Sequence, residues 1–270
     1  MGKFDGVLLA SDFDDTLYDT QDRVCERNVK ALEYFMAEGG RFAISTGRAH
    51  RTFSPFLHLV PMNAPAVLSN GSALYDFQAD KMVLQTFLPE DVKEDFKAIC
   101  AAFPAVAFEA YHGEEIYAYR PNHVTDAHMV KVNTEYTEVS RIDDIPLPWT
   151  KAILQQEYDQ LLPVQPWLLE RWGEKYEAIF SNKVYLEITA KGSNKGGMVL
   201  RLAQLLGIQR EHIYCAGDNQ NDIPMLAVSA IPFAPANCAQ SVKDFGARVL
   251  CHCDDGLMGD IIEILDTIYE

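Results

Sequence analysis

The stretch that decides the fold is VLLASDFDDTL, which occupies residues 7–17. Residues 7–10 are apolar and predict a buried strand, and an acidic turn that contains Asp12 and Asp14 follows directly. A buried strand that runs into a polar turn and then a helix is typical of proteins in which strands and helices alternate around a parallel sheet.

The segments on either side of this stretch continue the alternation. Stripes of apolar residues at helical spacing, which predict helices, end at Gly39 and at Gly207. Short apolar runs, which predict strands, lie at residues 42–44, 66–69, 213–216, 231–233 and 248–250. We therefore predict an α/β fold in which both ends of the chain contribute to one doubly wound parallel sheet.

The middle of the chain has a different pattern. An amphipathic helix is predicted near residues 92–103, and alternating segments at 107–110 and 116–119 predict half-exposed antiparallel strands. We predict that residues 83–188 form an inserted α+β cap domain. The catalytic core then consists of residues 1–82 and 189–270.

Composition excludes several classes of partner. The 270 residues carry 23 Lys and Arg against 39 Asp and Glu, a formal net charge of −16, which disfavours nucleic acid and anionic membranes. The sequence lacks a recognisable targeting signal, and its apolar runs are shorter than the roughly 20 residues that span a bilayer. Together with six scattered cysteines, this predicts a cytoplasmic protein with reduced thiols.

Chemically distinctive residues cluster at predicted strand ends or at the start of the following helix. Ligands bind at the carboxyl ends of strands in open parallel sheets, so we expect these side chains to converge. Several carboxylates without histidine or cysteine favour Mg²⁺, which would supply the positive charge that an anionic substrate needs. The candidates are Asp12, Asp14, Thr46, Gly47, Lys195, Asp218, Asn221 and Asp222.

Phosphoryl transfer is a reaction that such a cluster can perform. The Asp12 carboxylate could attack phosphorus and form an aspartyl phosphate. Asp14, two residues later, could protonate the leaving group and then activate water. The Thr46 hydroxyl and the backbone around Gly47 could bind phosphoryl oxygens, and Lys195 adds positive charge.

The same residues resemble the four motifs of the haloacid dehalogenase superfamily. These motifs correspond here to residues 12–17, residues 45–48, Lys195 and residues 217–222. Flanking segments, among them Asn70-Gly71-Ser72, Leu186-Glu187-Ile188-Thr189 and Ala236-Asn237, resemble Cof-type sugar-phosphate phosphatases. The resemblance covers nearly the whole chain and is weakest inside the cap.

The resemblance implies a Rossmann-like core with a type IIB cap. It also implies that Mg²⁺ is bound by Asp12, the backbone carbonyl of Asp14, and Asp218. Asp222 is expected to support the metal site and Asn221 to reach the phosphate. Asp15 departs from the family, which more often has glycine at that position.

Other polar residues are predicted to have no role in the chemistry. Cys251-His252-Cys253 lacks a second ligand pair for zinc. We expect both cysteines near the end of a buried strand instead. No histidine is assigned to a metal. Arg48 could bind substrate or pair with a surface acid. The acids expected in loops are Asp143, Asp144, Asp254 and Asp255. The cap aromatics, expected mainly in a core or on a sheet face, are Tyr111, Tyr117, Tyr119, Trp149, Trp167 and Trp172.

The sequence thus predicts a Mg²⁺-dependent phosphatase that hydrolyses a small phosphorylated metabolite. Two alternatives stay open, namely a phosphomutase of the same superfamily and a non-enzymatic phospho-switch. The identity of the substrate does not follow from the motifs, because loop geometry and a few cap side chains decide it.

Overall fold

The computed structural model describes residues 2–269. Its core contains a five-stranded sheet in the order β14-β13-β12-β1-β2, with every neighbouring pair parallel. The strands are β1 (Leu8–Ser11), β2 (Arg41–Ile44), β12 (Ile213–Ala216), β13 (Pro232–Ala234) and β14 (Arg248–Val249). Because β1 lies between β2 and β12, the two ends of the chain share one sheet, which confirms the predicted fold class.

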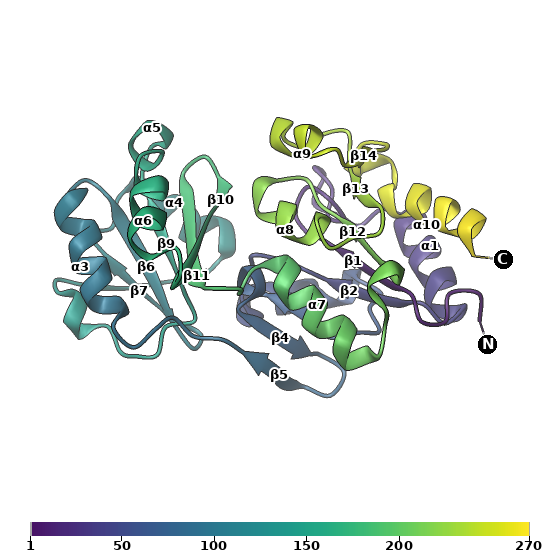
Figure 1. The fold of residues 1–270 in the computed structure, drawn as a ribbon, viewed down its shortest axis with the longest axis horizontal. Coiled ribbons are helices and arrows are strands. Elements are labelled where there is room, and N and C mark those ends of the chain that lie inside the picture. Colours follow the sequence, from purple (N-terminus) through teal and green to yellow (C-terminus); the bar gives the residue numbers. More distant parts are fainter. Residues whose placement is uncertain (1, 270) are drawn as a thin grey trace.

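Helices cover both faces of this sheet (Figure 1). On one face, α1 (Glu26–Ala37) and α10 (Leu257–Ile268) pack with Leu9 of β1. On the other face, Leu8 and Ala10 pack with α7 (Lys195–Leu206), α8 (Ile223–Leu226) and α9 (Gln240–Phe245). Successive side chains of a strand point to opposite faces, so Leu8, Leu9 and Ala10 of β1 are all apolar, and the strand ends at the polar Ser11.

An antiparallel hairpin that the sequence did not predict extends the core. β3 (Ala66–Leu68) lies beside β2 and is joined to the end of that strand by the parallel bridge between Val67 and Ser45. It then pairs antiparallel with β4 (Ala73–Asp76), which pairs with β5 (Lys81–Gln85). The short loop 77–80 makes antiparallel pairing the only possibility, since a parallel return needs a long crossover.

A second sheet of six strands forms the other half of the molecule (Figure 1). Its order is β10-β11-β9-β6-β7-β8, and only the β7–β8 pair is parallel. The strands are β6 (Ala107–His112), β7 (Glu115–Tyr119), β8 (Thr137–Val139), β9 (Lys151–Gln155), β10 (Tyr176–Asn182) and β11 (Tyr185–Ala190). The helices of this half are α3 (Val92–Ala102), α4 (His123–Val132), α5 (Tyr158–Leu161) and α6 (Val164–Trp172).

The strand β6 corrects the expectation of half-exposed strands. Phe108 and Ala110 pack in the apolar core of this half, while Glu109 and Tyr111 lie on the opposite face. That opposite face is also covered, and Glu109 is fully buried. An alternating pattern shows which residues share a face, but it does not show whether water or protein covers the polar face.

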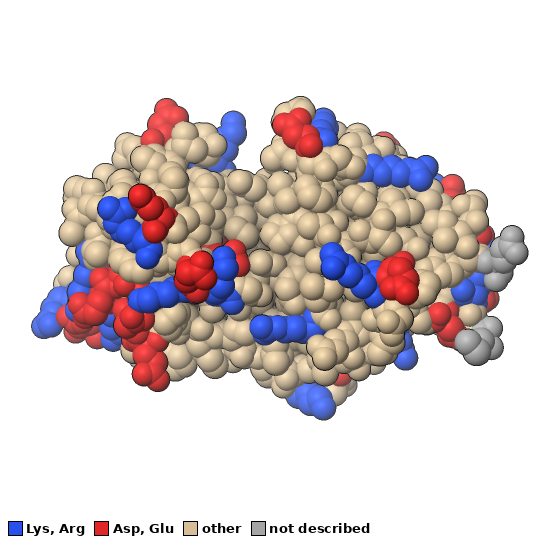
Figure 2. All heavy atoms as spheres, viewed as in Figure 1, with Lys and Arg blue, Asp and Glu red and all other residues tan. Residues whose placement is uncertain are grey.

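Two connections join the halves, one after β5 and one after β11. The expected boundaries at 82/83 and 188/189 therefore fall inside these strands, a few residues before each ends. Figure 2 shows a notch between the halves, with acidic and basic side chains interspersed on the visible face. The division into a catalytic core and an inserted cap remains our proposal.

The remaining short elements include α2 (His50–Phe53), which follows the turn after β2. All six cysteines are free thiols. Within residues 2–269, every helix is too short or too polar to cross a bilayer.

Candidate active site

The carboxyl ends of adjacent parallel strands bring the predicted acids together. Asp12 follows β1 and donates its backbone N–H to the Ala216 carbonyl at the end of β12. Asp218 follows β12, and carboxylate oxygens of Asp12, Asp218 and Asp222 all lie within 4.8 Å of one another. Asp12 and Asp222 are buried, so their charges are poorly screened by water.

Lys195 lies against this cluster. It begins α7 and is fully buried, and its Nζ lies 2.6 Å from Asp12 Oδ1 and 2.6 Å from Asp222 Oδ1. Burial by itself lowers the pKa of Lys195, but the two carboxylates outweigh burial and raise the pKa above its ordinary value. The lysine is therefore a permanent cation in this site.

One cation does not balance three acids. Burial raises the pKa of Asp12 to about 7, and the nearby charge of Asp222 adds to the rise. Burial, together with Asp12 and Asp222, also raises the pKa of Asp218 well above its ordinary value. Without a further cation, the cluster holds its negative charge at a cost in free energy, which is the condition that favours a metal ion.

Both carboxylate oxygens of Asp222 accept hydrogen bonds from the protein. Its Oδ1 accepts from Lys195, and its Oδ2 accepts from the backbone N–H groups of Asp218 and Asn219, both at 3.0 Å. A side chain on Gly217 would collide with it, since a Cβ there would lie 2.4 Å from Asp222 Cβ. Asp222 therefore positions Lys195 and the Asp218 loop.

Asp14 lies apart from the three-acid cluster, because its carboxylate binds Arg48. Arg48 Nε lies 2.9 Å from Asp14 Oδ2, and a terminal nitrogen of Arg48 lies 2.7 Å from Oδ1. Of the two roles open to Arg48, pairing with an acid is the one observed, and that acid is the candidate proton donor.

The turn after β2 supplies groups suited to phosphate. Thr46 is buried, and its Oγ1 accepts a hydrogen bond from the Arg48 N–H, which leaves the hydroxyl proton free to donate. Asn221 donates to Asn70 Oδ1, and Asn70 Nδ2 is buried without a partner among residues 2–269. A Cβ on Gly47 would lie 3.1 Å from that nitrogen, so glycine leaves the space in front of it open.

A cavity of about 170 Å³ lies between the two halves. The core lines it with Asp12, Asp14, Gly47, Arg48, Asp218 and Asn221. The other half contributes side chains from β6, α4, β9 and β11. Thr46, Lys195 and Asp222 lie behind this wall and do not line the cavity.

Comparison with known proteins agrees with this arrangement. Residues 9–257 match the family model of haloacid dehalogenase-like hydrolases. The chain belongs to this family.

Similar proteins include named phosphatases. The hydrolase is 25% identical over 247 residues to the putative phosphatase YxeH of Bacillus subtilis, with 88% of this chain and 90% of YxeH covered. It is 24% identical to the 5-amino-6-(5-phospho-D-ribitylamino)uracil phosphatase YitU of the same organism, covering 89% and 90%. Its fold matches the HAD subclass IIB sugar phosphatase BT4131 with a TM-score of 0.82 and 20% identity, covering 96% and 99%. The resemblance to the superfamily is thereby confirmed.

The sequence pattern missed the polar residues of the hydrolase that face the cavity from the second sheet. Lys151 on β9 donates to Glu187 on β11 at 3.0 Å and to the Gly47 carbonyl at 3.2 Å. His128 on α4 and Tyr111 on β6 also line the cavity. Tyr111 is one of the aromatics expected in a core or on a sheet face, of which one or two were expected to face the site. Nothing in the local sequence distinguishes these residues from others on the strands and helix that carry them.

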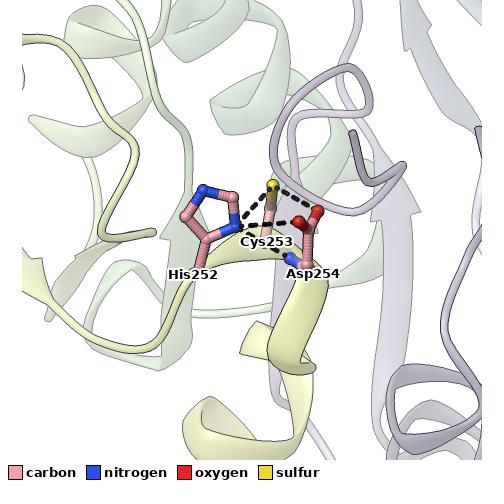
Figure 3. A group of neighbouring side chains, drawn as sticks. All are labelled: His252, Cys253 and Asp254. Atoms are coloured by element: carbon pink, nitrogen blue, oxygen red, sulfur yellow. Dashed lines mark hydrogen bonds and ion pairs between the residues drawn. The ribbon is translucent and has the colours of Figure 1, made fainter. Parts of the chain in front are cut away.

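The other candidate cluster of the hydrolase is His252, Cys253 and Asp254 (Figure 3). His252 Nδ1 accepts from the Asp254 N–H, and both Asp254 oxygens accept hydrogen bonds from Thr20. Burial, with Asp254 nearby, raises the pKa of the Cys253 thiol to about 12. These hydrogen bonds hold the loop that contains Thr20 against the loop that contains residues 252–254, so the cluster has a structural role. The expectation that Cys251 and Cys253 end a buried strand is wrong, since β14 is exposed and ends at Val249.

Proposed function

We propose that this hydrolase is a Mg²⁺-dependent phosphatase that hydrolyses a small phosphomonoester through an aspartyl phosphate on Asp12. The observation that carries the proposal is the position of Asp12. Its carboxylate lines a cavity at the end of β1, is held by buried Lys195, and lies two residues before a second acid. The phosphatases among its relatives support the same reaction class.

The donor set fits Mg²⁺. Asp12 and Asp218 each present carboxylate oxygens to a common point, and the backbone carbonyl of Asp14 would complete the protein ligands. Asp222 would support the metal site through its hydrogen bonds to Lys195 and to the Asp218 backbone N–H. Bound Mg²⁺ would neutralise phosphoryl oxygens and the surrounding acids.

In the first step, a carboxylate oxygen of Asp12 attacks phosphorus while the bond to the leaving oxygen breaks. The Asp14 carboxyl group donates its proton to that oxygen, so a neutral alcohol departs. Asn221, which lines the cavity, binds the phosphoryl oxygens, and Lys195, whose Nζ contacts Asp12 Oδ1, holds the attacking carboxylate in line.

In the second step, a water molecule attacks the phosphorus of the aspartyl phosphate. Asp14, now a carboxylate, takes the proton from the water. The bond to Asp12 breaks, which regenerates both acids and releases inorganic phosphate.

The two halves of the molecule have separate tasks in this proposal. Residues 83–188 form a cap that excludes bulk water and contacts the leaving group, while the core performs the transfer. The free thiols are compatible with a reducing compartment, and we propose a cytoplasmic location on that ground.

The decisive test compares Asp12→Asn with Asp22→Asn, since Asp22 is an exposed acid in the same segment. With p-nitrophenyl phosphate and Mg²⁺, Asp12→Asn should lose activity by about 10⁴-fold or more, whereas Asp22→Asn should match the wild type. Mass spectrometry after acid quenching should place phosphate on the peptide that contains Asp12. Retained turnover in Asp12→Asn would contradict the mechanism.

The same preparation tests the two alternatives. Incubation with a hexose 1-phosphate yields free phosphate from a phosphatase and an isomeric hexose phosphate from a mutase. In a phosphatase, Asp14 activates water and the phosphoenzyme is hydrolysed quickly. A phosphoenzyme that persists for minutes would therefore favour a phospho-switch.

A further inference from the structure

Behind the cap side of the cavity, in contact with His128 and Tyr111, lies a carboxylate that the proposed mechanism does not use. Glu109 on β6 is fully buried. Its oxygens accept hydrogen bonds from Gln155 at 2.6 Å and from the Tyr111 hydroxyl at 3.0 Å, and His128 Nδ1 lies 2.9 Å from Oε2. Burying a carboxylate is costly unless donors surround it, and three side chains bind this one group.

This arrangement fixes the orientation of His128. Because an ionised carboxylate only accepts hydrogen bonds, the ring nitrogen next to Glu109 carries a proton. Nε2 of the same ring forms no hydrogen bond with residues 2–269, and His128 lines the cavity. The Tyr185 ring, whose centroid lies 4.7 Å from that of the imidazole, limits its movement. Glu109 therefore acts as a positioning residue that leaves Nε2 available to a ligand.

The cap side of the cavity offers a lysine without a carboxylate partner, although the chain as a whole is acidic. Lys131 lies three residues after His128 on α4, lines the same cavity, and forms no ion pair with a carboxylate of the described chain. Lys151 also lines the cavity, but Glu187 balances its charge. Lys131 is thus a cation on the cap side of the cavity that no carboxylate of the described chain pairs with, which favours an anionic group beside it.

We propose that the cavity selects phosphomonoesters whose leaving group carries a second anionic group, either a carboxylate or another phosphate. This group binds Lys131 and Nε2 of His128, while the scissile phosphate occupies the core side. The inference rests on the phosphatase function proposed above. A cavity of about 170 Å³ restricts the leaving group to a small metabolite.

Matched substrates test this selectivity. 3-Phosphoglycerate has a carboxylate where glycerol 1-phosphate has a hydroxymethyl group. Fructose 1,6-bisphosphate has a second phosphate that fructose 1-phosphate lacks. We expect kcat/KM to favour the anionic member of at least one pair by about tenfold or more. The pair with the larger ratio identifies the preferred anion.

Three variants test whether the ratio of kcat/KM within each substrate pair depends on the cap residues that line the cavity. Lys131→Met should reduce the ratio several-fold, and His128→Asn should do the same, because asparagine can still donate to Glu109 but lacks a group at Nε2. Lys243→Met removes a lysine from the exposed face of α9 and serves as the matched control, with the wild-type ratio expected. The proposed selectivity is overturned if the kcat/KM ratio is near one in both substrate pairs, or if Lys131→Met leaves the ratio unchanged.

Failure of this inference is distinguishable from failure of the phosphatase proposal. Hydrolysis of p-nitrophenyl phosphate without discrimination within either pair rejects only the selectivity. If no phosphomonoester is hydrolysed, calorimetric titration of Asp12→Asn with the same pairs decides the matter. Tighter binding of the anionic member then supports the anion site, and equal binding rejects it.

Discussion

Arg48 holds both carboxylate oxygens of Asp14, at 2.9 Å from Nε and 2.7 Å from a terminal nitrogen. Its guanidinium lies 4.5 Å from the Phe56 ring centroid, so the arginine is itself held in place. Arg48 follows β2 and Asp14 follows β1, and the pair joins adjacent strand ends at the mouth of the cavity. Proton transfer from Asp14 to a leaving group therefore requires this pair to loosen.

The first prediction concerns the role of Asp14. Asp14→Asn should lower kcat for an alkyl phosphate by about 10²- to 10⁴-fold, because its leaving oxygen needs a proton. The first step with p-nitrophenyl phosphate should be affected less, since that leaving group departs as an anion. Single-turnover kinetics with both substrates measures the difference, and equal losses in the first step would argue against general acid catalysis.

The second prediction concerns Arg48 itself. Arg48→Met removes the bidentate partner of Asp14, so the carboxylate samples several rotamers, and kcat for an alkyl phosphate should fall by about tenfold. Arg51→Met, an exposed arginine three residues later, is the control and should behave like the wild type. An Arg48→Met variant that changes KM alone would indicate a role in substrate binding only.

The third prediction concerns the buried ion pairs of Lys195. Lys195→Met leaves the carboxylates of Asp12 and Asp222 buried without their cation and should lower the free energy of unfolding by about 3–5 kcal/mol. Lys191→Met breaks an exposed pair with Glu177 and should cost about 1 kcal/mol or less. Urea denaturation in EDTA compares the two, and similar losses would contradict the electrostatic account.

The fourth prediction concerns pH and magnesium. Burial, with help from Asp222, raises the pKa of Asp12 from 3.8 to about 7, so the folded protein retains a proton that the unfolded chain has lost. Stability from this group is present below pH 3.8 and is lost as the pH rises through about 7.

The metal-free protein should therefore become less stable between pH 5 and pH 8, and Mg²⁺ should raise the melting temperature more at pH 8. One pKa unit corresponds to about 1.4 kcal/mol, so the effect is measurable by calorimetry. Asp218→Asn removes one acid from the cluster and should largely abolish the magnesium effect. A magnesium effect that is equal at both pH values would refute this explanation.

The fifth prediction concerns the glycine that supports α7. Gly71 has φ of +97°, and a Cβ there would lie 2.2 Å from backbone atoms of Asn194, the residue that caps α7 before Lys195. Gly113 also has positive φ, at +60°, but nothing lies within 4 Å of its Cβ position.

Gly113→Ala should therefore cost only about 1–2 kcal/mol of backbone strain. Gly71→Ala should cost more and should also lower kcat, because α7 and Lys195 must shift. Urea denaturation and steady-state kinetics separate the two effects. Equal stability and full activity in both variants would show that the contact with Asn194 is unimportant.

Much of the core could be predicted from the sequence. Apolar runs such as residues 7–10 must be buried, and polar turns must follow them, so the strand ends and their acids could be located. The β4–β5 hairpin was missed because its strands are short and partly polar. Glu109 was missed because an alternating strand shows only which residues share a face.

The sequence by itself predicted that Asp12 and Asp218 occupy the same edge of one sheet, since parallel strands align their carboxyl ends. Only the tertiary structure decided which partner each charge takes. Asp14 pairs with Arg48. The oxygens of Asp222 accept hydrogen bonds from Lys195 and from backbone N–H groups. Glu109 is covered by α4, whose His128 contacts it. The physical reason is that strand and helix periodicity is local, whereas hydrogen-bond partners and burial depend on residues that are distant in the chain.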